Sequence, residues 1–211
     1  MIKLKSNHRV AYESSDHRIP YGTARDNNTK VGYIEEVEDF FDGEKIHYMD
    51  LGCAGGQLVV DFHTRGHVSV GLEGSDYGVK HNFANWPKYN ESVLFTCDIT
   101  KPFNLTDENG NPVLFDCISS WEFMEHIAQK DLDQVFTNVV NHLKPSGVFL
   151  GSVSYRAQEP YHQTVMQEPE WKAKYFDKYF NLVGKYRFTN KVREPKLGMS
   201  FYYFLQAPKK S

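Results

Sequence analysis

The most informative stretch of this sequence is residues 48–57, which read Tyr48-Met49-Asp50-Leu51-Gly52-Cys53-Ala54-Gly55-Gly56-Gln57. The pattern is typical of the end of a buried strand, a turn of small residues and the start of a helix. Small residues let the backbone approach a ligand closely, and open α/β sheets bind ligands at the carboxyl ends of central strands. The stretch therefore predicts a strand-turn-helix unit with a nucleotide-like ligand at the turn.

The spacing of the glycines narrows the choice of ligand. The dinucleotide fingerprint G-x-G-x-x-G, started at Gly52, requires glycine where this chain has Ala54 and Gln57. The phosphate-binding pattern G-x-x-x-x-G-K-[ST] is also absent from the sequence. Asp50 would repel a phosphate and would pair with an ammonium group. The turn thus favours a ligand that carries an amine over a dinucleotide.

Segments with strand and helix patterns alternate around this turn. Strands are predicted over residues 45–51, 67–72, 92–99, 114–119 and 148–154, and helices over residues 29–41, 56–64, 78–86 and 131–143. Such alternation indicates right-handed crossovers and a mainly parallel sheet. A helix over 168–180 is followed by strands over 185–190 and 201–207 with no helix between them. These two strands predict a closing antiparallel hairpin.

Acidic residues end the next two predicted strands. Glu73 follows Gly52 by about twenty residues, the position from which a carboxylate accepts the hydroxyl hydrogens of a ribose. Asp98 closes the following strand and could hydrogen-bond an adenine amino group, with Ile99 against the face of the base. Equally, Asp98 could cap a turn. The two acids and the turn would meet at one edge of a parallel sheet.

Together these residues resemble the class I S-adenosylmethionine-dependent methyltransferase family, from about Val31 to the end of the chain. Residues 50–56 match the family motif [DE]-x-G-x-G-x-G except at the middle glycine, where this chain has Ala54. Glu73 matches the ribose-binding acid of the family, and residues 97–99 match its adenine-side segment. Residues 143–147, Leu-Lys-Pro-Ser-Gly, match the family's entry to the fifth strand.

The resemblance implies a Rossmann-like, doubly wound α/β fold with a seven-stranded, mainly parallel sheet whose last strand is antiparallel. It implies a methyltransferase domain over residues 29–211. Residues 1–28 are predicted to be an irregular arm that could close over the site as a lid through Tyr21 and the arginines Arg9, Arg18 and Arg25. S-adenosylmethionine is the implied cofactor, and the residues expected to bind it are Asp50, Gly52, Ala54, Gly56, Glu73, Asp98, Ile99 and Trp121.

The stretch after the fourth predicted strand, Trp121-Glu122-Phe123-Met124-Glu125-His126, bears on the methyl acceptor. The Asp/Asn-Pro-Pro-Tyr motif typical of methyltransferases that act on base nitrogens is absent there, which favours an oxygen acceptor. Glu-x-x-Glu-His resembles two groups of the family. One group comprises ubiquinone-pathway, sugar and natural-product O-methyltransferases, and the other comprises metal-binding 2′-O-methyltransferases of small RNA.

Two roles are open for the polar residues of this stretch. On a helix Glu122, Glu125 and His126 would share one face, and with His162 they could hold Mg²⁺ or a similar divalent ion that lowers the pKa of a hydroxyl. Without a metal, His126 or His162 would be the general base. The predicted catalytic residues are therefore Glu122, His126 and His162.

Composition, net charge and cysteine count exclude or disfavour several further classes of protein. The 211 residues are 40% hydrophobic and 24% charged, which excludes a disordered chain, and the net charge of -3 disfavours sequence-independent binding to nucleic acid. The three cysteines form no C-x-x-C pair, and their odd number favours buried thiols in the cytoplasm. No apolar run reaches the roughly eighteen residues of a membrane span, and no signal core is present at the start.

We therefore expect methylation of an oxygen on a small hydroxylated acceptor such as a sugar or quinol. The alternative is metal-assisted 2′-O-methylation of RNA ribose. A nicotinamide-dependent reductase is disfavoured by Ala54 and Gln57, and a non-catalytic binding protein is disfavoured by the acids Asp50, Glu73 and Asp98.

Overall fold

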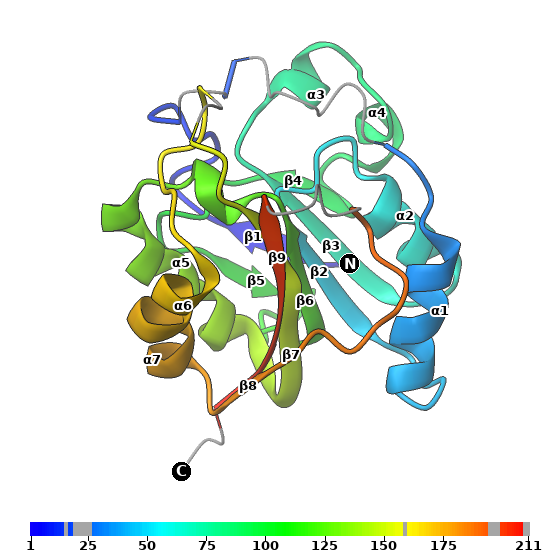
Figure 1. Cartoon of the computed structure of the whole chain (residues 1–211). Coiled ribbons are helices and arrows are strands. Elements are labelled where there is room, and N and C mark those ends of the chain that lie inside the picture. Colours follow the sequence, from blue (N-terminus) through cyan, green and yellow to red (C-terminus); the bar gives the residue numbers. More distant parts are fainter. Residues whose placement is uncertain (15–16, 19–26, 158–159, 194–198, 209–211) are drawn as a thin grey trace.

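A mixed sheet forms the centre of the protein, for which a computed structural model describes residues 1–14, 17–18, 27–157, 160–193 and 199–208 (Figure 1). Its strands are β2 (His47–Leu51), β3 (Val68–Glu73), β4 (Leu94–Thr96), β6 (Phe115–Trp121), β7 (Leu143–Ser154), β8 (Leu182–Gly184) and β9 (Ser200–Gln206). They form a seven-stranded sheet in the order β4-β3-β2-β6-β7-β9-β8. The first five run parallel, and β9 is antiparallel to both β7 and β8. The predicted mainly parallel sheet with an antiparallel last strand is confirmed.

Helices cover both faces of the sheet (Figure 1). They are α1 (Val31–Phe40), α2 (Gln57–Thr64), α3 (Tyr77–Lys80), α4 (Trp86–Tyr89), α5 (Leu132–His142), α6 (Glu168–Trp171) and α7 (Asp177–Tyr179), with η1 (Met124–His126), η2 (Gln129–Asp131) and the π-helical turn η3 (Lys172–Phe176). On one face, Tyr33 of α1 and Tyr48 of β2 pack against Phe62 of α2. On the other, Phe136 of α5 packs in the core that contains Met49 of β2. Adjacent residues of β2 thus enter opposite cores, as the alternation of side chains along a strand requires.

The segment after β3 differs from the prediction of one helix over residues 78–86. The structure has the short helices α3 and α4, separated by Asn82 and Ala84 with φ values of 50° and 51°. Residues in the left-handed region cannot continue a right-handed helix. The break lets Trp86 fold back onto Gly78, where a Cβ atom would lie only 2.3 Å from the indole ring.

The predicted strand over residues 185–190 is wrong, because the strand beside β9 is β8. In that segment the backbone N–H groups of Thr189 and Asn190 donate to the Glu36 carboxylate of α1, at 3.0 and 2.8 Å. The segment therefore crosses α1 instead of extending the sheet. The strand predicted over 92–99 is also shorter than expected and comprises β4 alone.

The start of the chain is more regular than the predicted irregular arm. Residues Lys3–Lys5 form β1, which pairs antiparallel with β5 (Asn104–Thr106) as a separate two-stranded sheet. A pairing across about one hundred residues leaves no local signal, because three residues are too few to show an alternating pattern.

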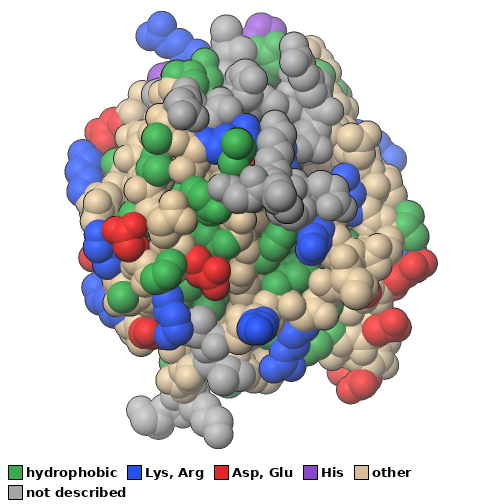
Figure 2. All heavy atoms as spheres, viewed as in Figure 1, with side chains coloured by type: hydrophobic (Ala, Val, Ile, Leu, Met, Phe, Trp, Pro, Cys, Tyr) green, Lys and Arg blue, Asp and Glu red, His purple; other side chains and the backbone are tan. Residues whose placement is uncertain are grey.

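Three further observations concern the cysteines, the helices and the surface charge of the described part of the chain. Cys53, Cys97 and Cys117 are buried, unpaired thiols. No helix among the described residues has both the length and the apolar composition needed to span a membrane. On the coloured part of Figure 2, Lys and Arg side chains are interspersed with Asp and Glu, so that face shows no continuous basic surface.

Candidate functional site

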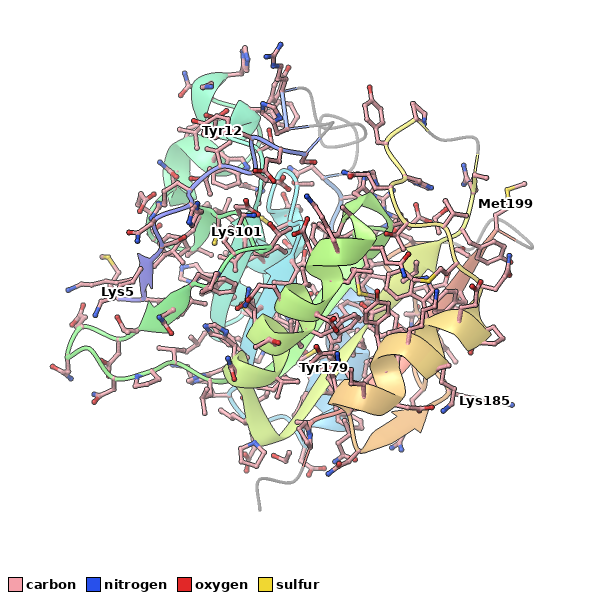
Figure 3. The ribbon with its side chains drawn as sticks, turned by 90° about the vertical axis from the view of Figure 1, so that its left-hand side faces the viewer. Lys5, Tyr12, Lys101, Tyr179, Lys185 and Met199 are labelled. Carbon is pink, nitrogen blue, oxygen red and sulfur yellow. The ribbon has the colours of Figure 1, made fainter. Side chains whose placement is uncertain are left out.

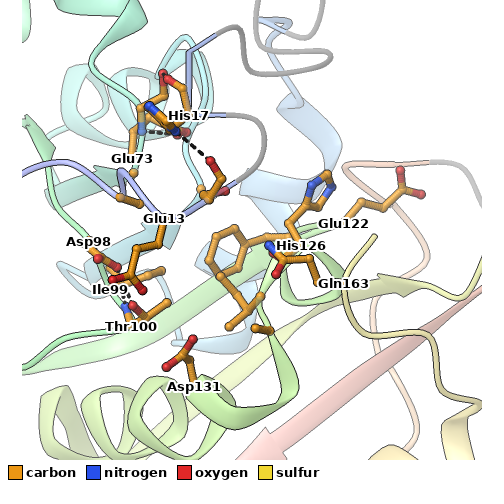
Figure 4. A pocket seen from close by; sticks show the side chains of 18 of the residues that line it. Glu13, His17, Glu73, Asp98, Ile99, Thr100, Glu122, His126, Asp131 and Gln163 are labelled. Carbon is orange, nitrogen blue, oxygen red and sulfur yellow. Dashed lines mark hydrogen bonds between the residues drawn. The ribbon is translucent and has the colours of Figure 1, made fainter. Parts of the chain in front are cut away.

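A cavity lies at the carboxyl ends of β2, β3 and β6, where the sequence predicts the ligand site (Figure 4). Of the residues predicted to bind the cofactor, the cavity is lined by Gly52, Ala54, Glu73, Asp98, Ile99 and Trp121. Glu122 and His126, from the stretch that bears on the methyl acceptor, also line the cavity. The part of the wall that they form is called the acceptor side, and the part with Glu73 and Asp98 the cofactor side. Asp50, Gly56, Glu125 and His162 do not contribute to the lining. The parallel strands therefore bring most of the predicted residues together, as the shared edge requires.

Two glycines shape the turn after β2. Gly52 has a φ of 73°, and a Cβ atom there would lie 2.5 Å from the Phe123 ring. Gly56, with a φ of 81°, precedes α2, and a Cβ atom there would lie 2.5 Å from Leu94. Both positions combine a left-handed backbone with a close contact, so any side chain would be strained and crowded. The left-handed backbone and the close contacts explain why the sequence motif has glycine at both positions.

Ala54 keeps the backbone shape of the glycine that the motif has at this position. Its φ is 52°, in the left-handed region that glycine adopts most readily. The Ala54 N–H donates to Glu73 Oε2 at 3.0 Å, and its carbonyl accepts from Trp86 Nε1 at 2.8 Å. These two hydrogen bonds hold the turn in a conformation that alanine by itself disfavours.

Glu73 is the last residue of β3 and lies at the cavity (Figure 4). Besides the contact with Ala54, its Oε1 atom accepts the N–H of Ser75 at 3.0 Å. These two backbone hydrogen bonds orient the carboxyl group. The carboxyl group is thereby held at the wall of the cavity.

Asp98 both caps a turn and lines the cavity, and the sequence had left the choice between these two positions open. Its Oδ1 atom accepts the backbone N–H and the hydroxyl of Thr100, at 3.0 and 2.6 Å, so it caps a turn. It is only 5% exposed and nevertheless lines the cavity next to Ile99. The turn bonds fix the direction of the carboxyl group at the cavity wall.

Asp50 lies deeper than expected, behind the glycine turn. It is 5% exposed and accepts a hydrogen bond of 2.5 Å from Ser119, whose hydroxyl oxygen lies 2.5 Å from the Tyr48 hydroxyl. Burial raises the pKa of Asp50 to about 7, and the negative charge of Glu73 adds to this rise. Desolvation outweighs the lowering by Ser119, so Asp50 titrates near neutral pH.

The expected helix through Glu122, Glu125 and His126 is not formed. Glu122 has a φ of 48° and precedes the single turn η1. Its Oε2 atom lies 3.8 Å from Nη1 of Arg193, which also lines the cavity. A left-handed glutamate is a strained backbone position of the kind that clusters at functional sites. Glu122 therefore lies at the cavity but does not share a helical face with the other two residues.

Glu125, His126 and His162 do come together. One possible ligand atom from each lies within 4.8 Å of the others. Glu125 is fully buried, and its Oε1 atom accepts the N–H of Ser154 at 3.0 Å, whereas Oε2 has no hydrogen-bond partner among the described residues. Burial raises the pKa of Glu125 to about 7. An orphaned buried carboxylate oxygen beside two imidazoles suits a divalent cation or a shared proton. Glu122 is not part of this group.

The loop after β7 places His162. The Nδ1–H group of His162 donates to the carbonyl of Arg156 at 2.9 Å, which leaves Nε2 as the acceptor or ligand atom. Further along, the backbone N–H of Gln163 donates to the carbonyl of Glu125 at 2.8 Å, and the Thr164 hydroxyl donates to the carbonyl of Ile127 at 2.7 Å. These bonds fasten the loop to η1. The His126 and His162 rings consequently lie 5.1 Å apart in an edge-to-face arrangement.

The sequence interpretation missed several lining residues. Ala11, Glu13, Ser14 and His17 come from the arm, and Lys130, Asp131, Gln163 and Arg193 come from the acceptor side. Among these residues Gln163 directly follows the predicted His162, whereas the arm residues adjoin none of the motifs. Of the arm residues predicted to form a lid, Arg9 pairs with Glu91 and Arg18 is exposed. Tyr21 and Arg25 lie outside the described residues.

Comparison with known families and proteins bears on the chemistry of this cavity. The family model described as a methyltransferase domain matches residues 25–191. Among curated proteins, the ubiquinone biosynthesis O-methyltransferase of Rickettsia prowazekii is 24% identical over 139 residues, which is 65% of this chain and 52% of that protein. The chain thus spans about half the length of the curated relatives that it matches.

Solved structures share the fold at low sequence identity. An S-adenosylmethionine-dependent methyltransferase from Clostridium acetobutylicum has a TM-score of 0.59 and 15% identity, with 87% of this chain and 94% of that chain covered. The magnesium protoporphyrin IX methyltransferase of Synechocystis, solved with bound S-adenosylmethionine, has a TM-score of 0.54 and 13% identity, with coverages of 84% and 80%. These similarities support the Rossmann-like fold.

Proposed function

The chain belongs to the methyltransferase-domain family, and from this premise we propose that it transfers a methyl group from S-adenosylmethionine to an oxygen of a small hydroxylated acceptor such as a sugar or quinol. The observation that carries the proposal is the two-sided cavity, with Glu73 and Asp98 on one side and His126 on the other (Figure 4). The similarity to ubiquinone O-methyltransferases supports an oxygen acceptor. A cytoplasmic location, favoured by the unpaired cysteines, belongs to the same proposal.

The residues on the cofactor side fit an amine-bearing nucleoside. Glu73 would accept the ribose hydroxyls, Asp98 would accept from the adenine amino group, and Ile99 would pack on the base. The backbone at Gly52 and Ala54 would lie against the methionine part. When bound, S-adenosylmethionine supplies a methyl group on a positively charged sulfur, and its leaving group is neutral.

The acceptor side would orient the hydroxyl and accept its proton. A neutral His126 imidazole can take the proton that leaves an attacking hydroxyl near pH 7. Holding two reactants at near-attack distance contributes roughly 7–11 kcal/mol, whereas a general base contributes about 10²–10⁴-fold. Positioning by the cavity walls should therefore account for most of the rate enhancement.

Calorimetric titration tests the cofactor. The wild-type protein should bind S-adenosylmethionine and S-adenosylhomocysteine and should not bind NADH. Glu73→Ala should abolish this binding, while Glu44→Ala, at an exposed glutamate outside the cavity, should leave it unchanged. Unchanged affinity in the Glu73 variant would contradict the ribose assignment, and binding of NADH alone would favour the reductase.

A second candidate, metal-assisted transfer that includes 2′-O-methylation of RNA ribose, is favoured by the Glu125, His126 and His162 group. A divalent ion held there would lower the pKa of a nearby hydroxyl. Equilibrium dialysis with Mg²⁺ or Mn²⁺ tests the ion independently of activity. Stoichiometric binding that Glu125→Gln removes would support this candidate, and turnover that is unaffected by EDTA would contradict it.

A further inference from the structure

The amino-terminal arm, of which residues 1–14, 17 and 18 are described, is attached to the strand ends that carry the two cofactor-side acids. The backbone N–H of Asp98 donates to the carbonyl of His8 at 2.9 Å, and the N–H of Ala11 donates to the carbonyl of Gly74 at 2.8 Å. The hydroxyl of Ser75 donates to the carbonyl of His17 at 2.5 Å. Gly74 and Ser75 directly follow Glu73 in the sequence. The arm is therefore bonded to both places where the ribose and the adenine are proposed to lie.

Arm side chains also form part of the cavity wall. Ala11, Glu13, Ser14 and His17 line the cavity. Figure 4 shows His17 near Glu73, and Glu13 on the same side of the cavity as Asp98. The Nδ1–H of His17 donates to the Ser14 carbonyl at 2.6 Å, which fixes the ring. The adenosine end of the cavity thus has an inner wall from the sheet and an outer wall from the arm.

Contacts outside the cavity hold the arm in this position. Arg9 forms an ion pair with Glu91, and the amino group of Met1 lies 2.8 Å from Glu108 Oε1. Strand β1 pairs with β5 at the start of the arm. Figure 3 shows the arm running from Lys5 past Lys101 to Tyr12 along this edge of the molecule. The described arm is a packed part of the fold and differs from a frayed terminus, which lacks such contacts.

We propose that the arm is the outer wall of the adenosine subsite, so that cofactor binding and docking of the arm strengthen each other. The inference rests on the proposed function, because it requires the nucleoside to lie between Glu73 and Asp98. Two binding events that share an interface are coupled reciprocally. A change that loosens the arm should weaken the cofactor, and the cofactor should protect the arm by the same factor.

Gly74 offers a variant that acts on the arm. A Cβ atom at Gly74 would lie 3.0 Å from the Cβ atom of Ala11, and the next described atom is the Cys97 carbonyl oxygen at 4.0 Å. Gly74→Ala should therefore press on the arm, and Ala11→Gly should remove the opposing atom. We expect Gly74→Ala to weaken S-adenosylhomocysteine binding by about three- to tenfold, roughly 0.7–1.4 kcal/mol. The double variant should return to within about twofold of the wild type.

Arg9→Ala tests the same coupling from outside the cavity. It should weaken binding by about two- to threefold, as expected for loss of an exposed ion pair. The matched control is Arg65→Ala, which removes the Arg65–Glu38 ion pair far along the chain from the arm and should not change binding. Hydrogen exchange should show slower exchange at the Ala11 amide when S-adenosylhomocysteine is added, and Gly74→Ala should reduce that protection.

The outcomes separate this inference from the proposed function. Absence of S-adenosylhomocysteine binding in the wild type would contradict the proposed function. Wild-type binding together with unchanged affinity in folded Gly74→Ala and Arg9→Ala would overturn the coupling alone. A double variant that stays as weak as Gly74→Ala would also overturn it, because the new methyl group would then act on the ligand directly.

Discussion

The two sides of the cavity are assembled from different lengths of chain. The inner wall of the cofactor side comes from residues 50–100, in which three neighbouring parallel strands end at one edge. The acceptor side combines the end of β6, the loop after β7 and Arg193. Each side contains one buried carboxyl group whose pKa burial raises to about 7, Asp50 and Glu125.

The surroundings of these two carboxyl groups differ. Asp50 receives a hydroxyl hydrogen bond from Ser119, which continues to Tyr48. Glu125 receives one backbone hydrogen bond from Ser154, and its other oxygen has no hydrogen-bond partner among the described residues. A satisfied polar network holds a site in one geometry, whereas an unsatisfied oxygen is stabilised by a proton, a cation or a ligand. This difference leads to a hypothesis that the following predictions test: the cofactor side is preorganised, and the acceptor side is completed by what binds there.

The largest effect is expected for Gly52→Val. Preorganisation of the cofactor side depends on the turn, and a side chain at Gly52 meets both a φ of 73° and the Phe123 ring at 2.5 Å. Calorimetry should detect no binding of S-adenosylmethionine. Gly43→Val is the matched control, because Gly43 has a φ of 71° with no atom within 4 Å of its Cβ position. Equal loss of binding in both variants would show that backbone strain alone is responsible.

A large effect on turnover is expected for His126→Ala. Loss of a general base should lower kcat by about 10²–10⁴-fold, while cofactor affinity stays unchanged because the cofactor side is intact. His63→Ala, at an exposed histidine on α2, is the control. Parallel losses of affinity and kcat would mean that the two sides of the cavity are not separable. An unchanged kcat would move the base to His162.

The carboxyl groups predict a pH dependence of stability. A carboxyl group whose pKa is near 7 when folded and about 4 when unfolded binds more protons in the folded state, so stability falls as pH rises through this window. Glu125→Gln should therefore raise the stability of the ligand-free protein at pH 8, by about 3 kcal/mol at most, and by less at pH 5.

Asp50→Asn tests the other buried carboxyl group in the same measurement. It should stabilise the protein less than Glu125→Gln, because the ionised Asp50 already accepts the Ser119 hydroxyl. Denaturant unfolding at the two pH values supplies both free energies. Glu44→Gln, at an exposed position, should show no such trend. A larger gain in stability from Asp50→Asn than from Glu125→Gln would mean that the acceptor side, and not the cofactor side, is the preorganised one.

The smallest effect is expected for Ala54→Gly. Relief of the left-handed conformation should raise the free energy of unfolding by about 1–2 kcal/mol. The greater freedom of glycine in the unfolded chain should lower it by roughly 0.4–1 kcal/mol. We expect a gain in stability of about 1 kcal/mol or less, with cofactor affinity unchanged. A thermal melt detects the first and calorimetry the second. Weaker cofactor binding would show that the Ala54 methyl group contacts the ligand.

Local spacing was sufficient to predict the glycine turn and the two acids, Glu73 and Asp98, that line the cavity. The turn after β2 needs glycine for steric reasons that act within a few residues, and acids that end adjacent parallel strands meet at one edge. The alternation of strands and helices likewise predicted the parallel sheet. In the turn, the strand-end acids and the parallel sheet, the residues that contact one another are the same residues that form the sequence pattern.

The acceptor side depended on contacts between distant segments. The predicted helical face of Glu122, Glu125 and His126 failed because Glu122 adopts a left-handed backbone beside Arg193. His162 reaches His126 because the following loop is hydrogen-bonded to η1.

Amino-acid order alone was enough for the parallel part of the sheet, the glycine turn and the acids at its edge, since short-range sterics and strand geometry act in every chain with that spacing. The docked arm, the strained Glu122 and the meeting of His126 with His162 arose on folding. Their hydrogen bonds join residues tens of positions apart, and which such pairs form is set by how the whole chain packs.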